Sequence, residues 1–165
     1  MSLATLSDPS WDEIESFRGP PPPEPRQAAT AWNLNVLLVE DDAADTSLIL
    51  DVLKRHPSVS VARAVDAPQT ALEHLALGRM GPDLILLDIH MPRIDGFTFL
   101  ERVRLIPEMA DVPVVFLTTS CLARDAMQAK QSSASWYLIK PDSYAELQSR
   151  LDRVIKRAMS GTWNK

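Results

Sequence analysis

The chain has 165 residues, enough for one domain and some additional sequence, and its 45% hydrophobic and 24% charged residues are ordinary for a globular protein. Its formal net charge of −5 argues against binding to nucleic acid or to an anionic membrane, and no apolar run approaches the roughly 20 residues of a membrane span. With a single cysteine, Cys121, and no signal peptide, the sequence predicts a cytoplasmic protein without an internal disulfide.

Residues 1–33 differ in composition from the rest of the chain, and we expect them to form a mostly flexible extension. A short helix is predicted over residues 8–17, where Trp11 and Phe17 would lie on one weakly amphipathic face. The proline-rich residues 19–25 predict an extended polyproline spacer. The simplest interpretation is a disordered leader, and the alternative is an arm whose aromatic face docks on a partner or on the domain itself.

From Leu34 onward, short apolar runs alternate with stretches of helical spacing. Five strands are predicted, over residues 35–39, 59–64, 83–88, 113–119 and 135–140. The helices are predicted around the apolar stripe of Leu48, Ile49, Val52 and Leu53, from Pro68 to Gly78, after Gly96, over residues 122–131 and over residues 143–159. Apolar strands that alternate with helices are typical of a parallel sheet covered on both faces. The predicted fold class is α/β, a five-stranded, doubly wound (βα)5 domain over residues 34–159, followed by a tail over residues 160–165.

Polar side chains stand at the carboxyl ends of four of the predicted strands. The first strand ends at Glu40 and Asp41, the third at Asp88, the fourth at Thr118 and the fifth at Lys140. Each of these residues alone has an ordinary explanation, as a helix cap, a core residue or a solvated lysine. Because a doubly wound sheet gathers its strand ends at one edge, we expect these side chains to form one site.

The residue types at these strand ends predict a particular chemistry. Converging carboxylates favour a divalent cation, Mg²⁺, which prefers oxygen ligands and would offset the repulsion between Glu40 and Asp41. Lys140 and Thr118 would supply an ammonium and a hydroxyl to the oxygens of a phosphoryl group. Asp88 is the candidate nucleophile, because an aspartate can form an acyl phosphate. Together these groups predict phosphoryl transfer.

Several neighbouring polar residues are interpreted as structural. Asp42 is expected to turn away from the site and cap the first helix, and Asp45 to face the positive end of that helix. His56 and His74 are expected to face solvent. Cys121 is interpreted as an ordinary thiol.

Four segments of the chain match, in order, the motifs of one protein family: LLVEDD, LILLDIHMPRIDG, PVVFLTT and WYLIKP. With them the chain resembles the receiver domain of bacterial two-component response regulators over about residues 34–159. The first segment resembles the acidic pair of that family, the second its phosphoacceptor strand and loop, and the last two the strands that end in Thr or Ser and in Lys-Pro. The resemblance implies a flavodoxin-like receiver fold. The segment LTTS also resembles receivers that partner phytochrome-type kinases.

The resemblance implies a role for each candidate site residue. Asp88 would accept the phosphoryl group, and Thr118 and Lys140 would bind its oxygens. Thr118 and Tyr137 would move together as the switch, with the tyrosine ring rotating inward. Mg²⁺, or Mn²⁺, would be held by Glu40, Asp41, Asp88 and the backbone carbonyl of His90. The position of His90 also tunes hydrolysis of the acyl phosphate in this family.

The resemblance also implies partners. A sensor histidine kinase or a histidine phosphotransfer protein would donate the phosphoryl group. Because the chain ends soon after the last predicted helix, we expect a stand-alone regulator that has no DNA-binding output domain and acts on a downstream protein. A phosphorylation-dependent homodimer through the fourth helix and the last strand is a further expectation. We expect Mg-dependent self-phosphorylation and dephosphorylation only, and no other enzymatic activity.

Four alternative functions stay open from the sequence. A phosphorelay intermediate or a phosphate sink would use the same residues. A phosphatase of the haloacid-dehalogenase type also forms an aspartyl phosphate, but it needs a second acid two residues after the nucleophile, where this chain has His90. A receiver-shaped scaffold that no longer switches is disfavoured, because every expected pocket residue is present.

Overall fold

The structure is a computed structural model that describes residues 33–119 and 123–163. Its five parallel strands form one sheet in the order β2-β1-β3-β4-β5. The strands are β1 (Leu34–Val39), β2 (Val59–Val65), β3 (Leu84–Asp88), β4 (Val114–Thr118) and β5 (Trp136–Ile139). The predicted helix over residues 8–17, the proline-rich spacer and Cys121 lie outside the described residues.

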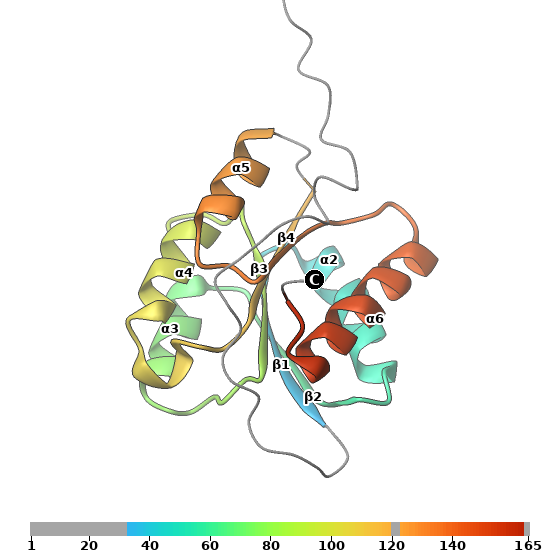
Figure 1. The fold of residues 1–165 in the computed structure, drawn as a ribbon, viewed down its shortest axis with the longest axis horizontal. Coiled ribbons are helices and arrows are strands. Elements are labelled where there is room, and N and C mark those ends of the chain that lie inside the picture. The colour runs from blue at the N-terminus through green and yellow to red at the C-terminus, as the bar shows by residue number, and fades with distance from the viewer. Residues whose placement is uncertain (1–32, 120–122, 164–165) are drawn as a thin grey trace, which may run out of the picture.

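Helices cover both faces of the sheet, with α3, α4 and α5 on one face and α2 and α6 on the other (Figure 1). They are α2 (Ala43–Arg55), α3 (Pro68–Ala76), α4 (Gly96–Arg104), α5 (Ala123–Gln131) and α6 (Tyr144–Ser160), and the short 3-10 helix η1 (Pro107–Met109) follows α4. This arrangement confirms the predicted doubly wound (βα)5 fold. In the described part of the chain, no helix is both long and apolar enough to span a membrane.

The core lies on both sides of the sheet, which explains why the central strands are apolar at almost every position. β3 and β4 are buried throughout. On the side of α3, α4 and α5 the core includes Leu87, Phe99 and Phe116. On the side of α2 and α6 it includes Leu38 and Leu86. Strands buried on both faces have continuous apolar runs, so this sequence pattern required a parallel, two-sided sheet.

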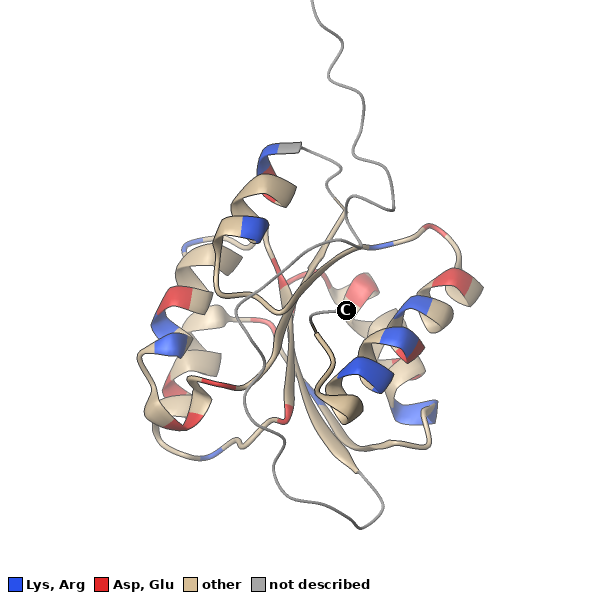
Figure 2. Cartoon of the chain, in the orientation of Figure 1, with Lys and Arg blue, Asp and Glu red and all other residues tan. Residues whose placement is uncertain are grey.

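Helix α6 buries one apolar side, as the sequence predicts, and carries both basic and acidic residues on the rest of its surface (Figure 2). The Arg157 guanidinium lies 3.7 Å from the centroid of the Trp136 ring, a cation–π distance that joins the helix to β5. Trp163 follows the helix and is only 2% exposed, within the core cluster on this side of the sheet. The last described residues therefore belong to the packed domain.

The predicted apolar stripe of the first helix is wrong at one position. Leu48 is 48% exposed, whereas Ile49, Val52 and Leu53 are buried. The buried residues follow an i, i+3, i+4 pattern, which places a single narrow stripe against the sheet. Leu48 lies at the flank of that stripe and faces solvent.

The expectation that His56 and His74 face solvent is also wrong. The His56 side chain is 13% exposed and links two elements: its Nε2 is 3.2 Å from Asp152 Oδ1 on α6, and its Nδ1 accepts from the Ser58 amide at 3.1 Å. His74 is half-buried in α3, with a buried Nδ1 atom. Helical spacing alone does not distinguish these two positions from exposed ones. Their burial comes from neighbouring elements, which the spacing within one helix does not reveal.

Candidate functional site

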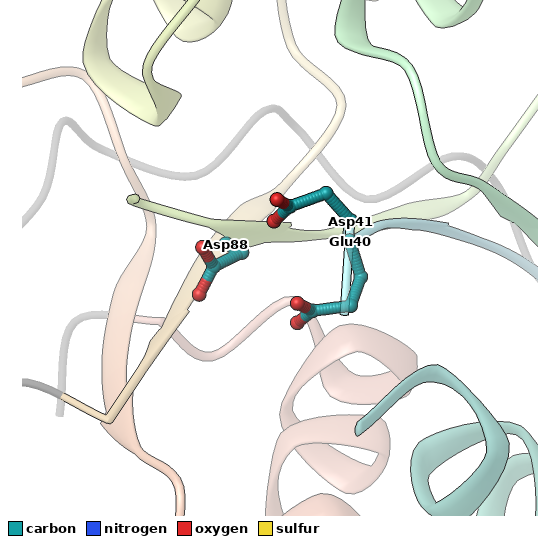
Figure 3. Close-up of side chains that lie close together, drawn as sticks. All are labelled: Glu40, Asp41 and Asp88. Carbon is teal, nitrogen blue, oxygen red and sulfur yellow. The ribbon is translucent and has the colours of Figure 1, made fainter. Parts of the chain in front are cut away.

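The acidic cluster lies where the strand order of the sheet reverses, between β1 and β3, which is the usual place for a site in this kind of fold. Glu40 and Asp41 directly follow β1, and Asp88 is the last residue of β3. One carboxylate oxygen from each residue lies within 4.8 Å of the others, and Figure 3 shows the three side chains around a common space. Glu40 and Asp88 are buried, whereas Asp41 is exposed.

The Lys140 ammonium lies among carboxylates at this edge of the sheet. Its Nζ is 2.5 Å from Glu40 Oε2, 2.8 Å from Asp45 Oδ2 and 3.1 Å from Asp88 Oδ1. Burial alone would lower the pKa of Lys140, but hydrogen bonds to Asp45 and Glu40 and attraction to Asp88 outweigh burial and raise that pKa. Lys140 is therefore charged in the folded protein and offsets the repulsion among these acids.

Glu40 is held from two sides. Burial raises the pKa of the Glu40 carboxyl, and the hydrogen bond from Lys140 limits the rise. The other carboxylate oxygen, Oε1, accepts from the Asp42 amide at 3.2 Å. The Asp42 side chain in turn accepts from the Asp45 amide at 2.9 Å and is the N-cap of α2. The predicted cap is thus confirmed, and it fixes the turn that carries Glu40.

Asp45 belongs to the site, which sequence reasoning missed. The sequence placed it only near the positive end of the first helix, but its carboxylate also binds Lys140. Helix α2 begins four residues after β1 ends, so a side chain in the first turn reaches back to the strand edge. The available signal was this short connection, which brings first-turn acids close to the site.

Hydrogen bonds tie together the ends of β3, β4 and β5. Asp88 Oδ2 accepts from the His90 amide at 2.8 Å. Thr118 is fully buried, and its Oγ1 lies 3.5 Å from His90 Nδ1. The Lys140 amide donates to the Thr118 carbonyl at 2.7 Å. The candidate nucleophile, hydroxyl and ammonium are therefore positioned by one continuous set of contacts.

Tyr137 in β5 and Lys140, which directly follows that strand, have different surroundings. The Tyr137 ring is 2% exposed and packs in the core on the side of α3, α4 and α5, so in this structure it already lies inward. Arg150 on α6 donates through Nη1 to the Ile139 carbonyl at 2.6 Å. Because Ile139 directly precedes Lys140, this bond fixes the strand end that carries the ammonium.

The loop after Asp88 is anchored by a close approach of backbone. The Gly96 amide donates to the Ile89 carbonyl at 2.9 Å, and a Cβ atom at Gly96 would lie 2.5 Å from the Asp88 carbonyl oxygen. Asp95 caps α4 by accepting from the Thr98 amide at 2.7 Å. Only glycine fits at position 96 without moving the backbone of Asp88.

The donors at the strand edge suit a hard divalent cation. Three carboxylates with oxygens this close together are ligands that Mg²⁺ and Mn²⁺ accept in proteins. Asp41 is exposed, so a cation can reach the cluster from solvent. Asp88 belongs to this acidic cluster, and its Oδ1 is 3.1 Å from Lys140 Nζ, so the ammonium and a cation held by the cluster would both lie near a group bound to Asp88.

Residues 36–152 match the response regulator receiver domain family. The chain belongs to this family. Among curated relatives of this receiver, the DNA-binding dual master transcriptional regulator RpaA of Synechocystis is 34% identical over 122 residues, which is 74% of this chain and 49% of RpaA. The probable methanogenesis regulatory protein FilR2 of Methanothrix harundinacea is 33% identical over 134 residues, 79% of this chain and 85% of FilR2. The receiver chain thus spans about half the length of RpaA and most of FilR2.

Solved structures include receivers with the same fold. The phosphorylated cyanobacterial phytochrome response regulator RcpA has a TM-score of 0.71 and 26% identity, over 78% of this chain and 95% of RcpA. The Mn²⁺-bound response regulator Rcp1 has a TM-score of 0.63 and 29% identity, over 73% and 91% of the two chains. The receiver domain of a sensor histidine kinase from Pseudomonas aeruginosa PAO1, with magnesium in its active-site cleft, has a TM-score of 0.61 and 30% identity, over 75% and 98%.

Proposed function

We propose that this receiver accepts a phosphoryl group on Asp88 and thereby switches its binding to other proteins. The donor would be the phosphohistidine of a sensor histidine kinase or of a histidine phosphotransfer protein. One observation carries the proposal: the Asp88 carboxylate ends the central strand β3, 3.1 Å from Lys140 Nζ and in the same acidic cluster as Glu40 and Asp41. Phosphoryl transfer depends chiefly on such positioning and charge neutralisation.

Asp88 acts as the nucleophile in the transfer step. One of its carboxylate oxygens forms a bond to phosphorus while the P–N bond of the phosphohistidine breaks. The partner imidazole retains the electron pair of that bond and takes up a proton. The His90 amide, which donates to Asp88 Oδ2, holds the carboxylate in a fixed orientation. Lys140 lies close enough to Asp88 to stay with the transferred group and neutralise its charge.

Glu40, Asp41, Asp88 and the backbone carbonyl of His90 would hold Mg²⁺ or Mn²⁺. The ion, when bound, supplies positive charge that neutralises the incoming phosphoryl oxygens. Asp41 is the exposed member of this set and would be the first ligand that an incoming cation meets. Glu40 contacts Lys140 through one carboxylate oxygen, Oε2. Its other carboxylate oxygen would bind the metal.

Thr118 would transmit the modification to the surface, and the buried Tyr137 ring would hold the resulting conformation without rotating. The Thr118 hydroxyl would leave its position near His90 Nδ1 to bind a phosphoryl oxygen, and the inward orientation of Tyr137 would be retained in the modified state. The surface that changes would be that of α5 and β5, where a downstream protein or a second copy of the chain would bind. A phosphorelay intermediate or a phosphate sink would share the chemistry and differ only in the partner. In either case we propose no enzymatic turnover beyond self-phosphorylation and dephosphorylation.

The proposal is tested by incubating the protein with Mg²⁺ and a small phosphodonor such as acetyl phosphate, and measuring intact mass. We expect a phosphoryl adduct in the wild type, and none in Asp88→Asn, because the amide is not a nucleophile of this kind. Asp83→Asn is a matched control with the same change of charge, at the opposite end of β3. An adduct that persists in Asp88→Asn, or a wild type that stays unmodified with several donors, would refute the proposal.

Metal affinity separates the roles of the adjacent acids. We expect Asp41→Ala to weaken Mg²⁺ binding at least tenfold, because one of three clustered carboxylates is lost. Asp42→Ser keeps an N-cap and should leave that affinity nearly unchanged. Calorimetric titration with Mg²⁺ measures both. A larger loss of affinity in Asp42→Ser than in Asp41→Ala would overturn the assigned ligand set.

A further inference from the structure

A further acid reaches the phosphoryl site from helix α5, through His90. Asp125 lies in the first turn of α5 and is 4% exposed. Its Oδ2 is 3.3 Å from His90 Nε2, and its Oδ1 is 3.4 Å from Arg124 Nε. This contact was not predicted, because Asp125 lies 35 positions after His90 and no motif contains it.

The Asp125 carboxylate has an unsatisfied oxygen. Oδ2 is buried, and no donor in the described residues reaches it with full hydrogen-bond geometry. The His90 Nε2 atom lies 3.3 Å from this oxygen, within ion-pair distance, and is therefore the candidate for the missing donor. A buried carboxylate without a donor is costly. This cost favours the His90 orientation in which Nε2–H points at Asp125.

The two nitrogens of the His90 ring thereby receive different roles. With the proton on Nε2 facing Asp125, Nδ1 is an acceptor, and it lies 3.5 Å from the Thr118 hydroxyl. The His90 side chain is 49% exposed, so it borders solvent, although both of its ring nitrogens lie close to protein atoms. A histidine ring fixed by a carboxylate on its far nitrogen is a common way to hold an imidazole in one orientation.

We propose that Asp125 is a positioning residue that holds the His90 ring in place as a wall of the phosphoryl site and so slows hydrolysis of the phosphorylated form. In that hydrolysis, a water oxygen bonds to phosphorus, the acyl O–P bond breaks, and Asp88 regains its carboxylate as inorganic phosphate and a proton are released. A fixed ring at the solvent border restricts the approach of water, whereas a released ring leaves that side open. This inference rests on the proposed function of Asp88.

The first test measures the lifetime of the adduct. After removal of the phosphodonor, we expect the phosphoryl group to be lost roughly fivefold faster in Asp125→Asn, the factor that corresponds to the net worth of one hydrogen bond. Asparagine keeps the size of the side chain, and Asp111→Asn, an exposed acid elsewhere, is the matched control. Thermal unfolding of each variant separates this effect from a loss of α5, whose N-terminal turn an acid also stabilises.

A double-mutant cycle tests whether Asp125 acts through His90. His90→Gln should also speed the loss of the phosphoryl group, and the double variant should match His90→Gln alone, because the group that Asp125 positions is then absent. A purely structural role of Asp125 predicts additive effects instead. Additive effects, or an unchanged lifetime in Asp125→Asn, would overturn the inference while leaving the phosphorylation of Asp88 intact.

A second readout does not depend on phosphorylation. Imidazole ¹⁵N spectra of the unmodified protein should show His90 as the Nε2–H tautomer in the wild type and as a mixture of tautomers in Asp125→Asn. The same mixture in both proteins would show that Asp125 does not position the ring. The proposed function fails separately, if the wild type forms no adduct at all.

Discussion

Replacing Lys140 with methionine is expected to lower the free energy of unfolding at neutral pH by about 3–5 kcal/mol, the usual loss when one partner of a buried ion pair is removed. The lysine side chain is 8% exposed, and its ammonium contacts Glu40, Asp45 and Asp88. Methionine preserves the apolar stem and leaves three carboxylates without their cation. Urea denaturation measures the loss. Lys54→Met, an exposed lysine on α2, should change the free energy of unfolding by less than about 0.5 kcal/mol.

Mg²⁺ and pH should both change the size of this loss of unfolding free energy. Mg²⁺ should stabilise Lys140→Met more than the wild type, because added positive charge replaces the missing ammonium. The pKa of Lys140 is raised above its ordinary value of 10.5, so the folded protein holds this proton more tightly than the unfolded chain does. The advantage of the wild type is therefore complete below about pH 10.5 and declines as the pH rises through the folded-state pKa. Equal stability of the two proteins at pH 7 would contradict the assigned ion pairs.

Replacing Gly96 with alanine is expected to lower the free energy of unfolding by about 3 kcal/mol, at the upper end of the usual cost of overpacking. The added Cβ would lie 2.5 Å from the Asp88 carbonyl oxygen and 2.9 Å from the Ile89 Cα. Both are backbone atoms, so relief requires a shift of the loop that follows the phosphoacceptor strand. We therefore also expect slower phosphorylation of Asp88 in this variant.

Gly81→Ala is the matched control, because a Cβ there meets no atom within 4 Å. Its free energy of unfolding should stay within about 0.5 kcal/mol of the wild type. Thermal and urea denaturation of both variants, followed by adduct formation measured by mass, separate the two effects. A Gly96→Ala protein as stable as Gly81→Ala would show that the loop relaxes at little cost.

The arrangement of the fold was predictable because its signals are local and repeated. Continuous apolar runs such as Leu84–Leu87 occur only where both faces of a strand are covered, and their alternation with helices leaves few topologies. The strand-end residues Glu40, Asp41 and Asp88 were predictable for the same reason, since the sheet itself gathers them. The exposure of individual side chains was not predictable. Leu48 fits the helical pattern but lies beyond the contact between the helix and the sheet.

What the sequence did not provide is the set of contacts between distant elements. Asp45 and Asp125 are both first-turn acids, which look like ordinary helix N-terminal charges in a sequence. Their partners, Lys140 and His90, become visible only when the helices are placed against the strand ends. His56 behaves in the same way, because its contact with Asp152 depends on how α2 and α6 pack. The sequence shows which residues are charged, and only the three-dimensional arrangement shows which residues they contact.

The bond between Glu40 and Lys140 joins residues that are 100 positions apart. A growing chain presents its N-terminal part first, so Glu40, Asp45 and Asp88 are all made before β5 exists. Contacts of such long sequence separation form late, because closing the intervening chain is entropically costly. Until β5 joins the sheet, the acidic cluster lacks the ammonium that neutralises it. Repulsion among its carboxylates then destabilises a partly folded domain. Addition of the last strand to the sheet therefore also neutralises the acidic site, which favours cooperative folding of this domain.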